Sequence, residues 1–156
     1  MASSKTSSAR VFNIPTDQPF SAHKLALRVY YEDTDFSGFV YHASYLRFME
    51  RGRTEVLRDL GLLQRELALS DPAGATFFVV RAMQIDFRRP AHMDDLLSVE
   101  TKLEAIGGAS LTMRQEIRRH DALLLTARVT VALVSRGKPQ RLPAPMREAF
   151  ARLLRD

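Results

Sequence analysis

Apolar and polar residues alternate over residues 23–31, and this period of two predicts a β-strand. Apolar residues then recur every three or four positions over residues 45–60, which is the spacing of an amphipathic helix. Ser44 is a candidate N-cap for this helix, and Gly61 stands where helices commonly end in the left-handed conformation. The first part of the chain is therefore expected to be a strand followed by one long helix.

Strand patterns dominate residues 76–136. β-Branched and aromatic residues are frequent, and apolar positions alternate with polar ones. Strands are expected at residues 76–89, 97–106, 111–119 and 123–135. Gly107-Gly108 is a tight-hairpin signal between the second and third of these strands. The four strands are expected to follow one another as an antiparallel meander.

The remaining segments complete the predicted outline. Residues 1–20 are polar and Ser-rich, as flexible tails are. Residues 62–69 are expected to form a short helix before a turn at 70–74, and a second amphipathic helix is expected from Pro145. Residues 21–156 then form a single domain of the α+β class, with a curved antiparallel sheet of about five strands around one long central helix.

The composition is that of a soluble globular protein, with 156 residues of which 46% are hydrophobic and 26% charged. The absence of cysteine excludes disulfides, thiol nucleophiles and cysteine metal sites, and it suits the reducing cytoplasm. No apolar run approaches the roughly 20 residues that span a bilayer, and no secretory signal is recognisable. We expect a cytoplasmic protein that forms at least a homodimer, because an open sheet leaves an edge that a second copy can cover.

The net charge of +5 and the pI near 10 favour an anionic ligand, partner or surface, although a merely soluble basic protein has the same charge. Nucleic-acid binding is not expected, because aromatic residues among basic ones are limited to Phe87 beside Arg88 and Arg89. The basic C-terminal helix would allow at most peripheral contact with anionic lipid, or contact with an acidic carrier protein.

Residues 31–42, between the first strand and the long helix, concentrate groups that can do chemistry. They include three carboxylates, a glycine and a histidine, namely Glu32, Asp33, Asp35, Gly38 and His42. A helix start presents unpaired backbone N–H groups, and a carboxylate beside them can act on a carbonyl that they polarise. Alternatively, the aspartates are simply turn and cap residues at the end of a strand.

Two runs of sequence carry a resemblance to a known family. They are Val29–Tyr45, which contains Asp33-Thr34-Asp35-Phe36-Ser37-Gly38, and Glu50-Arg51-Gly52-Arg53-Thr54-Glu55. They resemble the hotdog-fold acyl-CoA thioesterases, and among these the Tol-Pal-associated branch of the 4-hydroxybenzoyl-CoA thioesterase group. The likeness extends more diffusely over residues 23–136, where the order of elements also matches. The resemblance implies the hotdog fold.

The resemblance also implies roles for three residues of the junction. Asp35 would be the catalytic carboxylate, acting either as a nucleophile that forms an acyl-enzyme anhydride or as a general base on water. Gly38 would let the backbone turn closely beneath the thioester. The backbone N–H of His42, at the helix start, would polarise the thioester oxygen, and its imidazole would lie near the attacking group or the leaving sulfur. Asp33 keeps the turn interpretation.

Tyr41, Arg88 and Arg89 are the other substrate-binding candidates. Tyr41 adjoins the helix start, with packing as its alternative role. The guanidinium groups of the two arginines suit the phosphates of coenzyme A.

Glu50 would either face the site as a second acid or pair with Arg47 or Arg53. The acyl pocket is expected between the long helix and the sheet. Four residues are candidates for its wall: Phe48, Met49, Phe77 and Phe78.

The implied function is hydrolysis of an acyl-CoA to a free acid and coenzyme A by a homodimer or a dimer-of-dimers tetramer. No metal or redox cofactor is expected, because the histidines have no metal-binding spacing and the chain has neither a Gly-x-Ser-x-Gly elbow nor a phosphate-binding glycine loop. The alternative is a non-hydrolytic protein of the same fold that binds an acyl thioester or an acyl carrier protein. The acyl chain length stays open.

Overall fold

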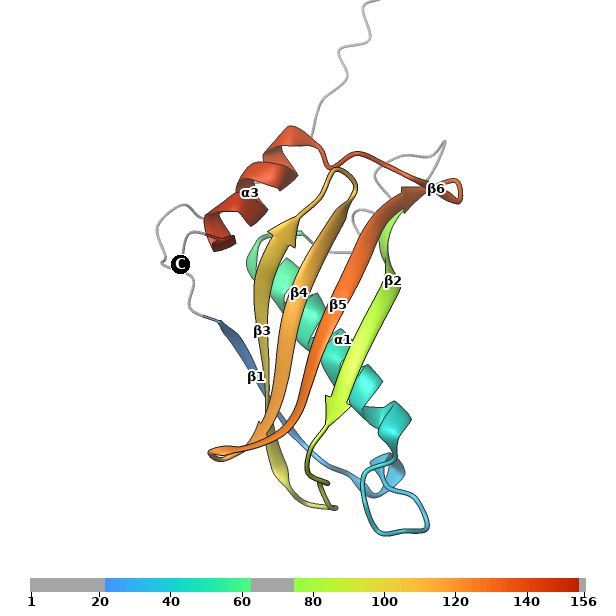
Figure 1. Cartoon of the computed structure of the whole chain (residues 1–156), viewed down its shortest axis with the longest axis vertical. Coiled ribbons are helices and arrows are strands. Elements are labelled where there is room, and N and C mark those ends of the chain that lie inside the picture. The colour runs from blue at the N-terminus through green and yellow to red at the C-terminus, as the bar shows by residue number, and fades with distance from the viewer. Residues whose placement is uncertain (1–21, 63–74, 155–156) are drawn as a thin grey trace, which may run out of the picture.

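A computed structural model describes residues 22–62 and 75–154 of the chain. The elements are β1 (His23–Arg28), a short 3-10 helix (Tyr31–Asp33), α1 (His42–Asp59), β2 (Thr76–Phe87), β3 (Leu96–Ile106), β4 (Ser110–Arg119), β5 (Ala122–Ser135), β6 (Lys138–Pro139) and α3 (Ala144–Leu154) (Figure 1). The tail expected at 1–20, nearly all of the helix expected at 62–69 and the turn at 70–74 lie outside the described residues.

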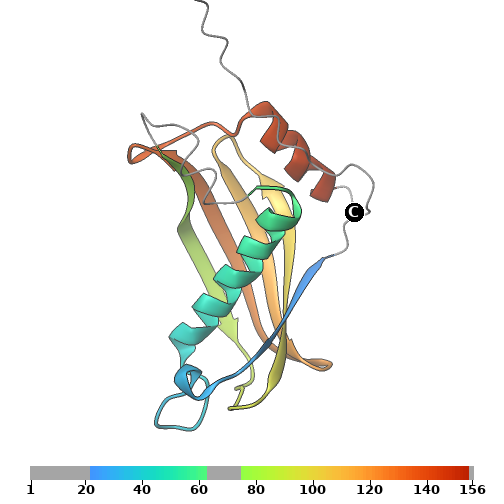
Figure 2. The ribbon, with the colours of Figure 1, turned by 180° about the vertical axis from the view of Figure 1, so that it is seen from behind.

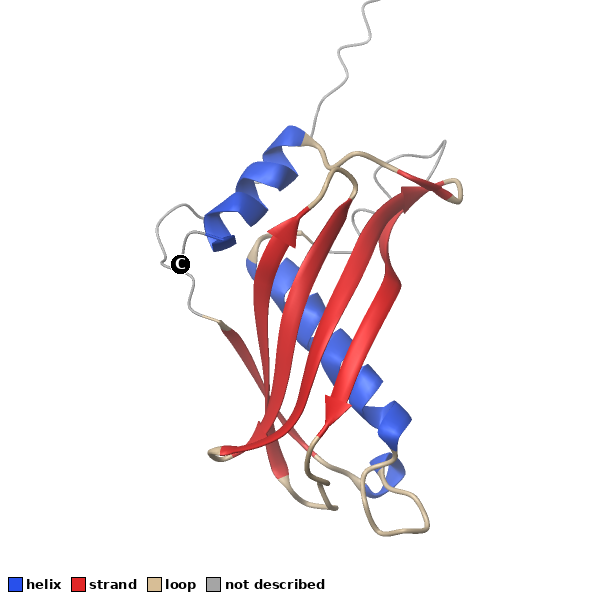
Figure 3. Ribbon diagram, in the orientation of Figure 1, coloured by secondary structure: helices blue, strands red, loops and turns tan. Residues whose placement is uncertain are grey.

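The strands form one antiparallel sheet in the order β1-β3-β4-β5-β2, with the two-residue β6 paired to β5 (Figure 3). The predicted sheet and central helix are therefore confirmed, but the predicted four-strand meander is wrong. Only β3, β4 and β5 are consecutive neighbours, and β2 lies on the far side of β5. The 14 residues of β5 are long enough to pair with the 12 residues of β2 along one side and with β4 along the other.

The helix α1 crosses one face of the curved sheet (Figure 2). Its buried residues recur at helical spacing, and they include Tyr45, Phe48, Met49, Gly52 and Val56. Every second residue of β3, β4 and β5 faces this helix, so that the core lies between the two layers. The opposite face of the sheet carries charged and hydroxyl-bearing side chains.

Two element boundaries differ from the sequence prediction. The strand β1 ends at Arg28, because Val29 exchanges backbone hydrogen bonds with Asp94 and Asp95 and the chain then turns through the 3-10 helix. The helix α1 begins at His42, so Ser44 is its third residue and is completely buried rather than being the N-cap. Gly61 has a φ of 76° just after α1, as the sequence predicts.

The helix α3 covers the end of the sheet that carries the β3–β4 hairpin, opposite the loop that precedes α1 (Figure 1). Its side chains Met146, Phe150 and Leu153 are buried, and Arg147 donates hydrogen bonds to the carbonyl oxygens of Gly107 (2.9 Å) and Gly108 (3.2 Å). The predicted C-terminal amphipathic helix is confirmed. Neither of the two described α-helices is both long and apolar enough to cross a membrane.

At Gly52 the backbone of α1 approaches the sheet closely. A Cβ atom added at Gly52 would lie 2.8 Å from Cγ1 of Val99, 3.0 Å from Oγ1 of Thr101 and 3.1 Å from Nε2 of Gln115. These distances are shorter than a normal van der Waals contact. The sheet therefore requires a residue without a side chain at this position of the helix.

We expect Gly52→Ala to lower the free energy of unfolding by about 1–3 kcal/mol, because overpacking outweighs the better helix propensity of alanine. Urea unfolding measures this change. Gly108→Ala is the matched control, since a Cβ there has no atom within 4 Å and this glycine needs no positive φ. Equal stability of the Gly52→Ala and Gly108→Ala variants would contradict the close packing.

Candidate active site

The segment that precedes α1 forms a tight hairpin around Asp35. Thr34 and Val40 form an isolated β-bridge, and the N–H of Asp35 donates to the carbonyl oxygen of Phe39 (3.1 Å). The N–H of Gly38 returns to the carbonyl oxygen of Asp35 (3.0 Å). Gly38 has a φ of 83°, a conformation that favours glycine and closes the turn. Gly38 therefore shapes the backbone that presents Asp35.

The carboxylate of Asp35 is held by one of its two oxygens. Oδ1 accepts hydrogen bonds from the backbone N–H of Ser37 (2.8 Å) and from its hydroxyl group (2.5 Å). These bonds, the hydroxyl bond first, lower the pKa of Asp35, and the nearby His42 lowers it slightly further. Asp35 is exposed and therefore ionised at neutral pH. Within residues 22–62 and 75–154, Oδ2 has no hydrogen-bond partner and can engage a ligand.

Asp33 has a structural role. Its Oδ2 accepts the N–H of Tyr30 (2.8 Å) and its carbonyl oxygen accepts the N–H of Tyr41 (2.8 Å), and its side chain is buried. This agrees with the turn interpretation of Asp33. The two aspartates of the Asp-x-Asp segment therefore have different environments. Asp33 is buried and binds the backbone on both sides of the hairpin, whereas Asp35 faces solvent.

The start of α1 offers backbone donors to a ligand. Tyr41 is the N-cap in an extended conformation, but it makes no side-chain capping bond, and the first turn has no acidic residue. The N–H groups of His42 and Ala43 make no hydrogen bond to any described residue. The positive end of the helix dipole therefore remains available to an anion or a developing oxyanion.

Aromatic rings and backbone bonds dock this hairpin onto residues 90–92. The rings of Phe39 and His92 meet edge-on at 4.9 Å, and the N–H of Val40 donates to the carbonyl oxygen of Ala91 (2.9 Å). The buried hydroxyl of Tyr45 in α1 accepts the N–H of Ala91 (3.0 Å). The hairpin, the helix start and the segment after β2 therefore form one unit.

The structure places Tyr41 beside His42, with ring centroids 4.5 Å apart. Tyr41 is exposed on one side, so it combines packing with access to a ligand. His92, in the adjoining turn, is exposed.

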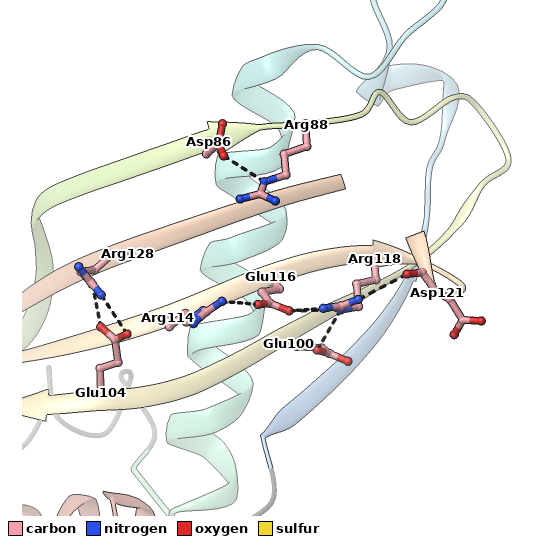
Figure 4. A network of polar contacts seen from close by, with 9 residues as sticks. All are labelled: Asp86, Arg88, Glu100, Glu104, Arg114, Glu116, Arg118, Asp121 and Arg128. Atoms are coloured by element: carbon pink, nitrogen blue, oxygen red, sulfur yellow. Dashed lines mark hydrogen bonds and ion pairs between the residues drawn. The ribbon is translucent and has the colours of Figure 1, made fainter. Parts of the chain in front are cut away.

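Arg88 lies on the outer face of the sheet, away from α1, where its guanidinium contacts Asp86 at 3.0 Å (Figure 4). Arg114, Arg118 and Arg128 share this face and are paired with glutamates. Arg89 is exposed, and no described residue contacts its guanidinium group. The structure therefore brings neither arginine into contact with Asp35, and their predicted role in phosphate binding stays a prediction.

A cavity of about 310 Å³ between α1 and the sheet is the second feature of the site region. Four residues of α1, three of them polar, and six apolar residues of the sheet line it, namely Glu50, Arg53, Thr54, Leu57, Phe78, Val79, Val80, Leu111, Met113 and Val131. Of the four predicted wall residues, only Phe78 lines this cavity. Phe48 and Met49 are buried in the core, and Phe77 is exposed on β2.

The sequence reading missed Arg53, which it considered only as a partner of Glu50. No ion pair joins Glu50 to Arg47 or Arg53 within the described residues, and Arg47 donates instead to the hydroxyl oxygen of Ser44 (3.0 Å). The sequence did contain one indication that Arg53 is buried. It stands four residues after Met49 and three before Val56, and therefore lies on the apolar stripe of α1.

Comparison with known proteins gives consistent matches. The pattern of the thioesterase superfamily matches residues 37–126. The chain is 43% identical over 129 residues to the acyl-CoA thioesterase YbgC of Haemophilus influenzae, covering 81% of this chain and 93% of that protein. It is 32% identical over 127 residues to the putative acyl-CoA thioesterase YneP of Bacillus subtilis, covering 81% and 88%. A crystal structure of a probable thioesterase from Bartonella henselae superposes with a TM-score of 0.76 at 48% identity, covering 79% of this chain and 100% of that chain.

We expect Ser37→Ala to raise the pKa of Asp35, because the hydroxyl group is the largest cause of its depression. The backbone N–H of Ser37 remains, so part of the depression should persist. A pH titration of the carboxyl carbon by NMR measures the shift. Thr34→Ala is the matched control, since the Thr34 hydroxyl donates to the carbonyl oxygen of Tyr31 (2.7 Å) and should leave Asp35 unaffected. An unchanged Asp35 pKa in Ser37→Ala would contradict this assignment.

Proposed function

This chain belongs to the thioesterase superfamily, and from this membership we infer that it is an acyl-CoA thioesterase, which hydrolyses an acyl-CoA to a free carboxylic acid and coenzyme A. One observation carries the inference most strongly. Relatives named acyl-CoA thioesterases or thioester hydrolases align over most of their length. In this chain, Asp35 has a carboxylate oxygen without a hydrogen-bond partner among the described residues, and it shortly precedes the start of α1, whose first backbone N–H groups are available. The non-hydrolytic binding protein is not favoured, because these relatives are named as hydrolases.

Asp35 is proposed to be the catalytic carboxylate. As a general base, its Oδ2 would take a proton from water while the resulting hydroxide attacks the carbonyl carbon of the thioester. As a nucleophile, the same oxygen would attack that carbon and form an anhydride, which water then hydrolyses. In both routes the carbon–sulfur bond breaks and the thiolate of coenzyme A leaves and takes up a proton. Both routes need an ionised Asp35, which the lowered pKa supports.

The helix start is proposed to stabilise the oxyanion. When the thioester carbonyl becomes tetrahedral, the N–H of His42 would donate to its oxygen, and the dipole of α1 would add to the effect. Gly38 would keep the turn beneath the thioester free of a side chain. The His42 imidazole and the exposed ring of Tyr41 would flank the thioester and the pantetheine arm.

Arg89 is the better of the two predicted phosphate contacts. It precedes the segment that docks on the hairpin, and its guanidinium has no partner in the described part of the chain. Arg88 is already engaged with Asp86. We propose that the reaction needs no metal or redox cofactor, that the enzyme acts in the cytoplasm, and that residues 21–156 form its one domain after a tail at 1–20. An acyl carrier protein is the second acyl donor that we propose.

We propose that β2 mediates a homodimer. Among the described strands it has only β5 as a neighbour, so it forms one edge of the sheet. Large apolar side chains along it are exposed: Phe77 (38%), Val79 (38%), Val80 (48%) and Phe87 (50%). A long apolar edge is a ready-made pairing surface. The cavity residues of β2 lie near the start of the strand, and the end of β2 leads to the segment that holds the Asp35 hairpin. Antiparallel pairing of two β2 strands would therefore place the cavity of one subunit beside the Asp35 hairpin of the other.

We expect Asp35→Asn to lower kcat by about 100- to 10,000-fold, the range typical of a removed acid–base group. Release of free thiol from a panel of acyl-CoAs measures the activity, and circular dichroism checks the fold. Glu32→Gln removes a neighbouring exposed carboxylate and serves as the control. A folded Asp35→Asn enzyme that releases thiol as fast as the wild type would show that Asp35 is not the catalytic carboxylate.

We expect the wild-type chain to be at least dimeric and Val80→Lys to shift it toward the monomer, because a lysine on an edge strand opposes pairing. Light scattering coupled to size-exclusion chromatography measures the mass. Leu96→Lys is the matched control, since Leu96 is equally exposed (49%) but lies on β3. A wild-type monomer, or a mass that responds equally to the two substitutions, would argue against the β2 interface.

A further inference from the structure

Arg53 places a positive charge on the buried side of α1. Only 8% of the residue is exposed, and its Nη1 donates to Oε1 of Gln115 (2.9 Å). Gln115 is fully buried on β4, and its Nε2 donates both to the carbonyl oxygen of Met49 (2.9 Å) and to Oγ1 of Thr101 (2.8 Å). Because both amide protons of Gln115 are used, its oxygen must point toward Arg53. The guanidinium is therefore held in a fixed position.

The charge of Arg53 has no close counter-ion. No carboxylate of the described residues lies within 4.0 Å of it, and burial lowers its pKa, while the more distant Glu50 acts in the opposite direction. Gln115 engages one of the five N–H donors of the guanidinium. A buried charge without a counter-ion is costly, so a ligand that supplies the opposite charge would bind favourably beside it.

The guanidinium lines the cavity between α1 and the sheet. Arg53, Glu50 and Thr54 form its polar wall, and the facing wall is apolar, with Phe78, Leu111 and Met113 among its residues. Its volume of about 310 Å³ is roughly twice that of an engineered apolar cavity that binds benzene. The space therefore suits an acyl group of moderate size that carries one polar end.

Arg53 is too far along the helix to serve the reacting carbonyl at the start of its own α1. It follows His42 by eleven residues, which corresponds to about 16 Å along the helix axis. A thioester oxygen at the His42 N–H would not reach this guanidinium. Its free donors are thus available to a different part of the substrate.

We propose that Arg53 is a specificity-determining residue that selects acyl-CoAs bearing a carboxylate at the end of the acyl group remote from the thioester. This proposal rests on the acyl-CoA thioesterase function and on the β2 homodimer proposed above, in which Arg53 of one subunit would act on an acyl group whose thioester is held at the helix start of the partner subunit. A carboxylate matches the planar fork of the guanidinium and supplies the close counter-ion that Glu50, which lines the cavity but forms no ion pair with Arg53, does not provide. The apolar wall contacts the methylene groups between the two ends. Gln115 acts as a positioning residue, because it holds the guanidinium without contacting the acyl group.

The test compares two acyl-CoAs of equal carbon number, adipoyl-CoA and hexanoyl-CoA. The wild type is expected to prefer adipoyl-CoA in kcat/KM, and Arg53→Met is expected to reduce that preference at least about tenfold, mainly through KM for adipoyl-CoA. Arg53→Lys keeps the charge and should retain part of the preference. Arg51→Met makes the same change on the exposed side of the same helix and should leave the ratio as in the wild type.

A wild type that hydrolyses both compounds without preferring adipoyl-CoA, or a folded Arg53→Met enzyme with the wild-type ratio, would overturn the role of Arg53 and leave the thioesterase function standing. A wild type that releases no thiol from any acyl-CoA would overturn the thioesterase function and this proposal together. The wild type also permits a test that does not depend on a variant. Adipate should raise its Tm more than hexanoate does, and equal shifts would contradict the proposal.

Discussion

The contact between α1 and the middle of the sheet is the constraint on which the other features depend. Gly52 lets the helix backbone approach β3 and β4, and the side chain of Gln115 reaches across to the carbonyl oxygen of Met49. A hydrogen bond from the sheet to the helix backbone fixes both the depth and the rotation of α1. The direction in which the helix start points and the position of Arg53 are consequences of that one contact.

The carboxylate of the site is positioned by other means. Asp33 stabilises the hairpin through its hydrogen bonds with the N–H groups of Tyr30 and Tyr41. Val40 binds the hairpin to the carbonyl oxygen of Ala91, and Tyr45 binds the helix to the N–H of Ala91. The exposed Asp35 therefore stands on a loop that is tied to the helix start and to the segment after β2. Rigid support of this kind suits the catalytic role proposed for Asp35, because small displacements of catalytic groups are costly.

Local patterns predicted the local structure well. The helix α1, the β3–β4 hairpin at Gly107-Gly108 and the amphipathic α3 follow from periodicity and turn residues. The position of β2 beside β5 did not follow, because strand order depends on pairing between residues far apart in the chain. Ser44 was expected as a cap because serine favours that position, but the backbone of Tyr41 occupies it and Ser44 is buried. The junction around Asp35 was identifiable because it is contiguous. The cavity combines α1 with three strands, so the sequence predicted its place between helix and sheet and the wall residue Phe78, but not the rest of its wall.

The separation of these two regions has a consequence for how such an enzyme changes. The hairpin and the helix start occupy residues 33–43, and the cavity wall is formed by α1 from residue 50 onward and by β2, β4 and β5. With the roles proposed for the two regions, substitutions in the cavity would alter acyl preference without touching the proposed reacting groups. New acyl preferences could then arise during evolution, or be built by directed mutagenesis, through substitutions in the cavity wall alone. The hairpin and the helix start would remain unchanged.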